Sequence, residues 1–201
     1  TMTEAISKKY ITDYKIWLPF VNENIERLNK ELEIYEIDKS IKSKLIFLFS
    51  CLINNGNRKC IVYCNDKTEI QDMRIAVDKL NEYFCLDISH SQITCDDNIE
   101  IRRTLLNNFS CSGKIELIFS VRILDECIDI PSCDSIFIAN PPCSKIRTIQ
   151  RINRATRIDK LNPNKIANIY IWCDEYNKMV KALSSIKEYD TEFITKIKVN
   201  E

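Results

Sequence analysis

Short apolar runs alternate with amphipathic segments along most of this chain. Runs of this length that are rich in β-branched residues predict parallel strands buried on both faces. The amphipathic segments repeat apolar positions at helical spacing, as Ile70, Met73, Val77 and Leu80 do, and such a repeat predicts a helix with one buried side. The expected strands are 59–64, 86–89, 115–120, 135–139 and 167–172, and the expected helices are 38–54, 68–84, 98–109, 147–157, 175–186 and 191–196. Strands alternating with helices predict an α/β fold with a doubly wound, mostly parallel sheet and right-handed crossovers.

The N-terminal part has a different pattern. Residues 3–9 predict either a short helix or a frayed end. Asp13 to Pro19 alternates apolar and polar positions, which predicts a strand ended by the proline. Residues 24–35 predict an amphipathic helix capped near Asn22. We therefore expect an extension of one strand and one helix over residues 1–38, followed by a single domain over residues 39–201.

Composition limits the classes of protein that fit. Hydrophobic residues make up 45% of the 201 residues and charged residues 29%, which is enough for a large core. The 29 basic and 29 acidic side chains cancel. Because a dedicated nucleic-acid binder is usually basic overall, any contact with nucleic acid must come from a local patch.

The ten cysteines do not form a metal-binding pattern. No CxxC pair occurs, and His90 is the only histidine, so we expect no metal site. Without a signal peptide the cysteines are expected to be reduced thiols in an intracellular protein, in the cytoplasm, the nucleus or a viral factory, and not secreted. No apolar run approaches the ~20 residues that a membrane span requires, so no membrane contact is expected.

The most distinctive chemistry lies in Arg147 to Arg157, which reads RTIQRINRATR. On a helix, Gln150, Arg154 and Arg157 would lie roughly on one side, because residues three and four apart are neighbours. Two guanidinium groups and an amide on one side suit a planar anion such as a phosphate or carboxylate. A solvated basic helix with surface ion pairs is the alternative.

Three segments in order resemble superfamily 2 helicases. Arg147 to Arg157 resembles motif VI, usually written QxxGRxxR; Phe119 to Pro131 (FSVRILDECIDIP) resembles motif V; Cys60 to Asp66 (CIVYCND) resembles the motif IV strand. The resemblance covers Ser40 to Cys173 and points to the second, C-terminal RecA-like domain of such a helicase. It implies a three-layer RecA-like fold with a mostly parallel central sheet flanked by helices.

The resemblance implies a set of residues that face ATP across a cleft between two motor domains. Arg157 would be the arginine finger, with Arg154 beside it and Gln150 orienting the γ-phosphate or the attacking water. Asp129 would accept the ribose hydroxyls, with Glu126 nearby. In the alternative interpretation the arginines pair with Asp159, Asp129 or Glu126 and serve structure only. ATP and Mg²⁺ would be held mainly by an N-terminal RecA-like domain of the same protein.

A second set is implied to contact the nucleic-acid backbone. Ser120 ends a strand, where open α/β sheets place ligands, and Arg122 follows it. Asn65 and Thr68 stand at the start of a predicted helix, where amide donors favour anions; capping by Asn65 or Asp66 is an equal alternative. The set also includes Arg102, seven residues before Phe109.

Several features separate the possible activities. No GxxxxGK[ST] phosphate loop occurs, so this segment alone is expected to be inactive and to belong to a larger ATP-dependent helicase or translocase. Motif VI begins with Gln150 rather than the histidine of RNA DEAD-box proteins, which favours DNA over RNA. Cys127 and Asn153 replace usual glycines, so a degenerate module that binds nucleic acid or acts as a scaffold without ATPase activity is the alternative. A Rossmann-type enzyme is disfavoured because no GxGxxG occurs.

Overall fold

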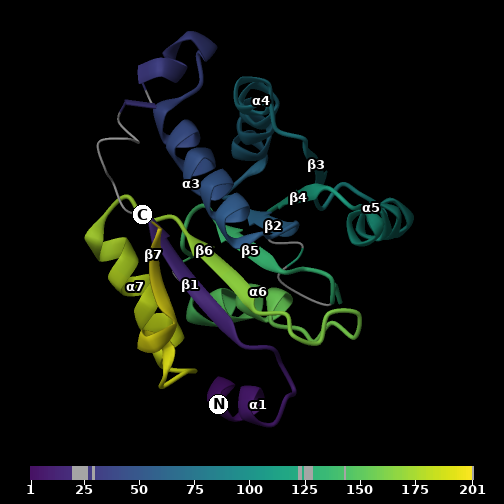
Figure 1. Ribbon diagram of the computed structural model, residues 1–201, viewed down its shortest axis with the longest axis vertical. Helices are drawn as coiled ribbons and strands as arrows, with labels where there is room; N and C mark the ends of the chain where they lie inside the picture. Colours follow the sequence, from purple (N-terminus) through teal and green to yellow (C-terminus); the bar gives the residue numbers. More distant parts are fainter. Residues whose placement is uncertain (20–26, 29, 122–123, 125–128, 143, 201) are drawn as a thin grey trace.

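A single parallel sheet forms the centre of this computed structural model, which describes residues 1–19, 27–28, 30–121, 124, 129–142 and 144–200. Its strands are β1 (Tyr14–Pro19), β2 (Lys59–Tyr63), β3 (Ile88–Ile93), β4 (Ile115–Ser120), β5 (Ser135–Ile138), β6 (Ala167–Ile171) and β7 (Ile197–Asn200). They lie in the order β3-β4-β2-β5-β6-β1-β7 (Figure 1). Every described pair is parallel, which confirms the expected α/β fold.

Helices connect the strands, and their first residues are set by capping side chains. The helices are α1 (Met2–Ser7), η1 (Leu32–Tyr35), α3 (Lys39–Asn55), α4 (Lys67–Phe84), α5 (Ile99–Cys111), α6 (Lys145–Ala155), α7 (Tyr176–Lys187) and η3 (Phe193–Lys196). Asp38, Asp66 and Asn98 each accept hydrogen bonds from backbone N–H groups in the first turn of α3, α4 and α5. These side chains satisfy donors that the helix itself leaves unpaired. The predicted helices over 38–54, 68–84, 98–109 and 175–186 are confirmed within a few residues.

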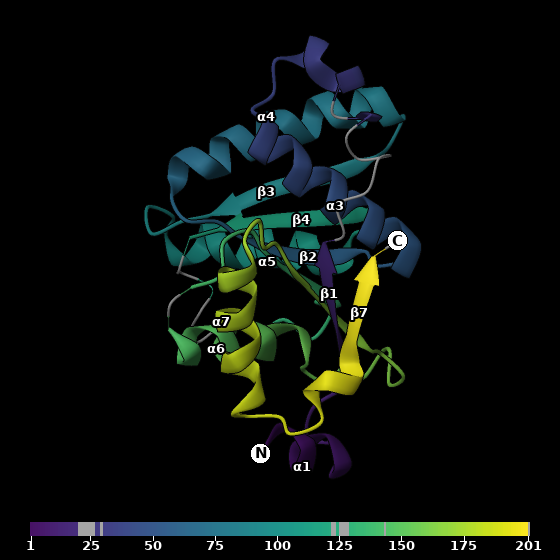
Figure 2. The ribbon, with the colours of Figure 1, turned by 90° about the vertical axis from the view of Figure 1, so that its left-hand side faces the viewer.

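Two apolar clusters lie on opposite faces of the sheet and make the fold three-layered. Cys60 and Val62 of β2 pack with α3 and α4, whereas Ile61 and Tyr63 face the side of α6 and α7. This division follows from the pleat, because successive side chains of a strand point to opposite faces. Figure 2 shows α3 and α4 on one side of the sheet and α6 and α7 on the other.

The predicted N-terminal strand lies inside the sheet. β1 pairs with β6 on one side and with β7 on the other. The helix predicted over 191–196 is wrong in part, because Phe193–Lys196 forms one 3-10 turn and β7 follows it. β1 and β7, from opposite ends of the chain, therefore lie side by side (Figure 2).

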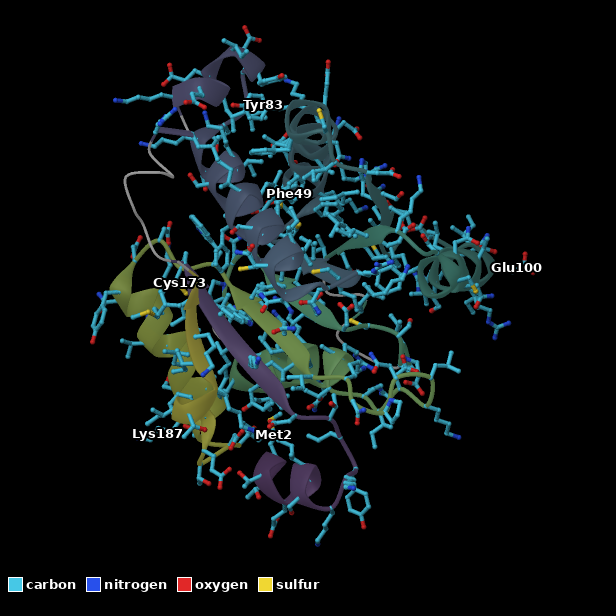
Figure 3. The ribbon with its side chains drawn as sticks, in the orientation of Figure 1. Met2, Phe49, Tyr83, Glu100, Cys173 and Lys187 are labelled. Atoms are coloured by element: carbon cyan, nitrogen blue, oxygen red, sulfur yellow. The ribbon has the colours of Figure 1, made fainter. Side chains whose placement is uncertain are left out.

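Other boundaries also differ from prediction. The strand predicted over 86–89 lies at Ile88–Ile93, so His90 stands within β3 and does not follow it. Asn22 lies outside the described residues; residues 27, 28, 30 and 31 are helical and lead into η1. Figure 3 places Tyr83, near the end of α4, beside this segment, where its ring meets Tyr35 edge-on and its hydroxyl donates to Glu31.

Candidate functional site

An exposed ion pair joins the end of the motif VI segment to the motif V segment. Arg157 Nη1 lies 3.0 Å from Asp129 Oδ1, and the two side chains are 40% and 64% exposed. Arg157 Nε is buried without a hydrogen-bond partner among the described residues. The structure thus brings together two residues that the resemblance assigns to ATP. The same contact is the Arg157–Asp129 ion pair expected if these residues serve structure only.

Arg157 is not on the helix, contrary to the spacing argument from sequence. α6 ends at Ala155, and Thr156 closes it by donating its N–H to the Ile152 carbonyl. The Thr156 carbonyl accepts the Thr12 N–H at 2.8 Å. The N-terminal segment therefore crosses the end of α6 and occupies a carbonyl that a longer helix would have used.

The remaining polar residues of α6 differ in exposure. Gln150 is half-buried, whereas Arg154 is 7% exposed. Arg151 is buried, and its guanidinium group lies 4.5 Å from the centre of the Tyr63 ring on β2. This contact fixes the inner side of α6 against the sheet through a cation–π interaction.

Asn153 replaces a usual glycine without backbone strain. It lies within α6, its side chain is exposed, and its φ is not positive. The conformational freedom of glycine is therefore not required at this position. Cys127, the other replaced glycine, lies outside the described residues, as do Glu126 and Arg122.

Lys165 holds the segment that follows Asp129. Its ammonium group donates to the carbonyls of Pro131 at 2.7 Å and Cys133 at 3.0 Å. Burial lowers the pKa of Lys165. Sequence reasoning missed this residue, because a lone lysine in a polar loop gives no sign that it will be buried.

The described residues of the set assigned to nucleic acid, Asn65, Thr68, Arg102 and Ser120, gather near the carboxyl ends of β2, β3 and β4. Cys64 N–H donates to the Ser120 carbonyl at 3.0 Å, so the turn at Asn65 lies beside the end of β4. Ser120 is fully buried, and its hydroxyl has no partner among the described residues. Contact with a phosphate would require the chain around Ser120 to open.

The start of α4 already carries two carboxylates. Asp66 Oδ1 accepts the Glu69 N–H at 2.8 Å, and Glu69 Oε2 accepts the Asn65 N–H at 2.7 Å. Asp66, and not Asn65, is therefore the N-cap of α4. Because these acids occupy the positive end of the helix, any anion here would depend on the exposed side chains of Asn65, Lys67 and Thr68.

Arg102 is committed to the loop between β3 and α5. Its Nη2 donates to the carbonyls of Thr94 at 3.2 Å and Cys95 at 3.4 Å, while its Nε is buried without a partner among the described residues. These bonds give Arg102 a structural role in the described conformation. Figure 3 shows Glu100, two residues earlier, on the outer side of α5.

A buried polar network at the same edge was not predicted. Lys44 Nζ on α3 lies 2.7 Å from Glu69 Oε1, and these side chains are 7% and 11% exposed. Asn140 Nδ2, just after β5, lies 2.8 Å from both Glu69 oxygens, and Asn140 Oδ1 lies 3.3 Å from Lys44 Nζ. We call Lys44, Glu69, Asn140 and the Asn65 N–H the carboxyl-edge network. Its members come from four places in the chain, so no local pattern reveals it.

The eight cysteines that the structure describes are free thiols, among them buried Cys60, Cys64 and Cys133. Burial raises the pKa of each of these three, to about 12 for Cys133. Within the described ranges, no three potential metal ligands lie together, and no helix has the length and apolar character to span a bilayer.

Comparison with solved structures identifies the fold. An ATP-dependent Type ISP restriction-modification enzyme, LlaBIII bound to DNA, matches with a TM-score of 0.76 and 16% identity over 98% of this chain. S. cerevisiae Dbp5 bound to RNA and ADP BeF3 matches with a TM-score of 0.61 and 16% identity over 94%. The C-terminal part of the Fun30 ATPase domain matches with a TM-score of 0.59 and 13% identity over 82%.

The matched region is a small part of the larger proteins. This chain covers 16% of the LlaBIII chain, 41% of the Dbp5 chain and 57% of the Fun30 chain. No curated protein matches by sequence. At these identities the likeness shows the fold alone, and it confirms the RecA-like architecture.

A protein-family comparison gives the assignment. The model of the helicase conserved C-terminal domain matches residues 43–159, which include β2 to β5 and all of α6. The matched segment therefore contains the three motif-like stretches recognised in the sequence. The chain belongs to the helicase conserved C-terminal domain family and has the fold of the second RecA-like domain of superfamily 2 helicases.

Proposed function

We propose that this chain is the second motor domain of an ATP-dependent helicase or translocase and that Arg157 completes its ATP site. The exposed Arg157–Asp129 pair carries this proposal. A guanidinium group beside a carboxylate supplies a donor fork for phosphate oxygens and an acceptor for a ribose diol. An exposed ion pair is worth only ~0–1 kcal/mol, so a nucleotide could separate the two groups at small cost.

The proposal divides the ATP site between two domains. A first RecA-like domain, joined through residues 1–38, would hold ATP and the Mg²⁺ that neutralises its phosphates. Arg157 would approach the γ-phosphate, Arg154 would support it from its buried position, and Gln150 would orient the γ-phosphate or the attacking water. Asp129 would accept the ribose hydroxyls, with Glu126 nearby. The absence of a phosphate loop in this chain agrees with such a division.

The carboxyl edge of the sheet is the proposed track for the nucleic-acid backbone. Asn65 and Thr68 are exposed there, and Ser120, Arg102 and Arg122 complete the proposed set. Backbone contacts fix position and do not read sequence. We propose DNA as the partner in preference to RNA, because motif VI begins with Gln150; the structural relatives include complexes with both.

ATP hydrolysis by the full-length protein tests the role of Arg157. Arg157→Ala should lower turnover by roughly 10³-fold or more, as removal of an arginine finger does, while ATP still binds. Arg157→Lys should restore little activity, because lysine has no planar fork. Asp174→Ala, which removes another exposed ion pair, is the control and should keep wild-type turnover. Equal turnover in wild type and Arg157→Ala would refute the assignment.

A further inference from the structure

We propose that Asn140 and Glu69 are positioning residues that couple nucleic-acid binding at the start of α4 to the motif VI helix. This inference rests on the proposed function. Its basis is the carboxyl-edge network, in which Glu69 contacts the Asn65 N–H, Lys44 and Asn140 together. Neither Glu69 nor Asn140 is among the residues assigned to ATP or to nucleic acid.

Glu69 accepts hydrogen bonds from three donors. Its two oxygens receive the Lys44 ammonium group, the Asn65 N–H and both contacts of the Asn140 amide, all between 2.7 and 2.8 Å. A nearly buried carboxylate is stable only when such donors surround it. Three donors therefore fix the position of the Glu69 carboxylate. A movement of one donor would shift the carboxylate and so change its contacts with the other two.

The network connects the two groups of proposed site residues. Asn65 stands in the turn between β2 and α4, at the carboxyl edge. Asn140 lies between the end of β5 and Ser144, the N-cap of α6. α6 in turn carries Gln150 and Arg154. A single side chain, Glu69, therefore links the proposed phosphate-contacting turn at Asn65 to Asn140, in the segment before motif VI.

Loss of the Asn140 amide is the cleanest perturbation. Asn140→Ala removes both contacts to Glu69 and the 3.3 Å contact to Lys44, but it leaves the Lys44–Glu69 ion pair in place, so neither buried charge loses its main partner. Glu69→Ala would strand the Lys44 ammonium group, and its failure to fold would be uninformative. Asp96→Asn is the matched control, because it breaks the exposed Lys67–Asp96 pair at the same turn of α4.

The test measures ATP turnover of the full-length protein with and without single-stranded DNA. Asn140→Ala should keep the basal rate and lower the ratio of stimulated to basal rate by about two- to thirtyfold, the range expected for altered coupling. Asp96→Asn should keep the wild-type ratio. A Thr68→Ala, Asn140→Ala double-mutant cycle should be non-additive in the DNA concentration needed for half-maximal stimulation.

Two results would overturn the inference without affecting the proposed function. One is an unchanged ratio in Asn140→Ala. The other is an equal fall of basal and stimulated rates, which would show a purely structural role. Failure of the proposed function has a different signature, because wild type itself would then show no turnover or Arg157→Ala would have no effect.

Discussion

Arg157 and Asp129 form an ion pair in which both charged groups remain exposed to solvent. Pairing at 3.0 Å gives each side chain a partner, and their exposure keeps both within reach of a ligand. Arg151 shows the contrast within the same segment: it is buried over the Tyr63 ring. The local sequence places both arginines in one motif, but only three-dimensional packing distinguishes Arg151, which holds α6 against the sheet, from Arg157, which we propose meets a phosphate.

Replacement of Asp129 by alanine should separate stability from nucleotide binding. The free energy of unfolding should change by less than ~1 kcal/mol, because the ion pair is exposed. In the full-length protein the KM for ATP should rise by roughly tenfold or more, if the carboxylate binds the ribose hydroxyls. Chemical denaturation and steady-state kinetics measure the two quantities. An unchanged KM would remove Asp129 from the proposed ATP site.

At the scale of elements, the helix ends depend on particular capping residues. Gly56 ends α3 in the left-handed conformation with φ +66°; its N–H donates to the Ile53 carbonyl, and the N–H of Asn57 donates to the Leu52 carbonyl. No heavy atom other than its chain neighbours lies within 4 Å of an added Cβ at Gly56, so crowding does not require glycine there. The backbone conformation alone does.

Gly56→Ala should therefore destabilise the domain by about 1–2 kcal/mol, the usual cost of a left-handed non-glycine residue. Gly113→Ala is the matched control, because Gly113 is also uncrowded but has no left-handed φ. Urea denaturation of the two variants beside wild type gives the difference. Equal midpoints for both variants would contradict the strain argument.

The elements that sequence predicted well are those with strong local signals. β4 agrees with its predicted range, and α3 agrees within a residue because Asp38 and Gly56 mark its ends. β7 was missed because four residues carry too little periodicity, and its pairing with β1 comes from the other end of the chain. β3 was misplaced because it lies at the edge of the described sheet, beside β4, and such a strand tolerates polar His90.

The candidate site was predictable only in part, because some of its features depend on contacts between distant segments. Motif spacing identified Asp129 and Arg157, and the structure brings them into contact. It did not reveal that Ser120 is buried or that Arg102 is bound to two backbone carbonyls. Burial and long-range hydrogen bonds arise from segments far apart in the sequence, so local pattern cannot supply them.

Across the whole molecule, the burial of thiols should make stability decrease with rising pH in the alkaline range. The buried Cys133 thiol has a folded-state pKa of about 12, above the ~8.5 of an unfolded cysteine. Between these values the unfolded state has lost the proton and the folded state keeps it. The contribution of the buried thiol to the free energy of unfolding is therefore complete below pH ~8.5, and it is lost as the pH rises toward 12. Cys60 and Cys64, whose pKa values are also raised by burial, act in the same direction.

The free energy of unfolding should therefore be lower at about pH 10 than at about pH 8. Urea denaturation at the two values measures this difference. Exposed Cys85 serves as the control position: Cys85→Ser should keep the wild-type pH dependence, whereas Cys133→Ala should weaken it. A flat stability profile for wild type over this interval would contradict the proposed cause.

The most direct measurement of the central claim is steady-state ATP hydrolysis by the full-length wild-type protein, with no nucleic acid, with single-stranded DNA and with RNA. If the domain is a DNA-dependent motor, DNA should stimulate turnover more strongly than RNA does. Stimulation by RNA alone would reverse the preference for DNA. No turnover under any of the three conditions would contradict the motor function, and the domain would then be a nucleic-acid-binding or scaffold module.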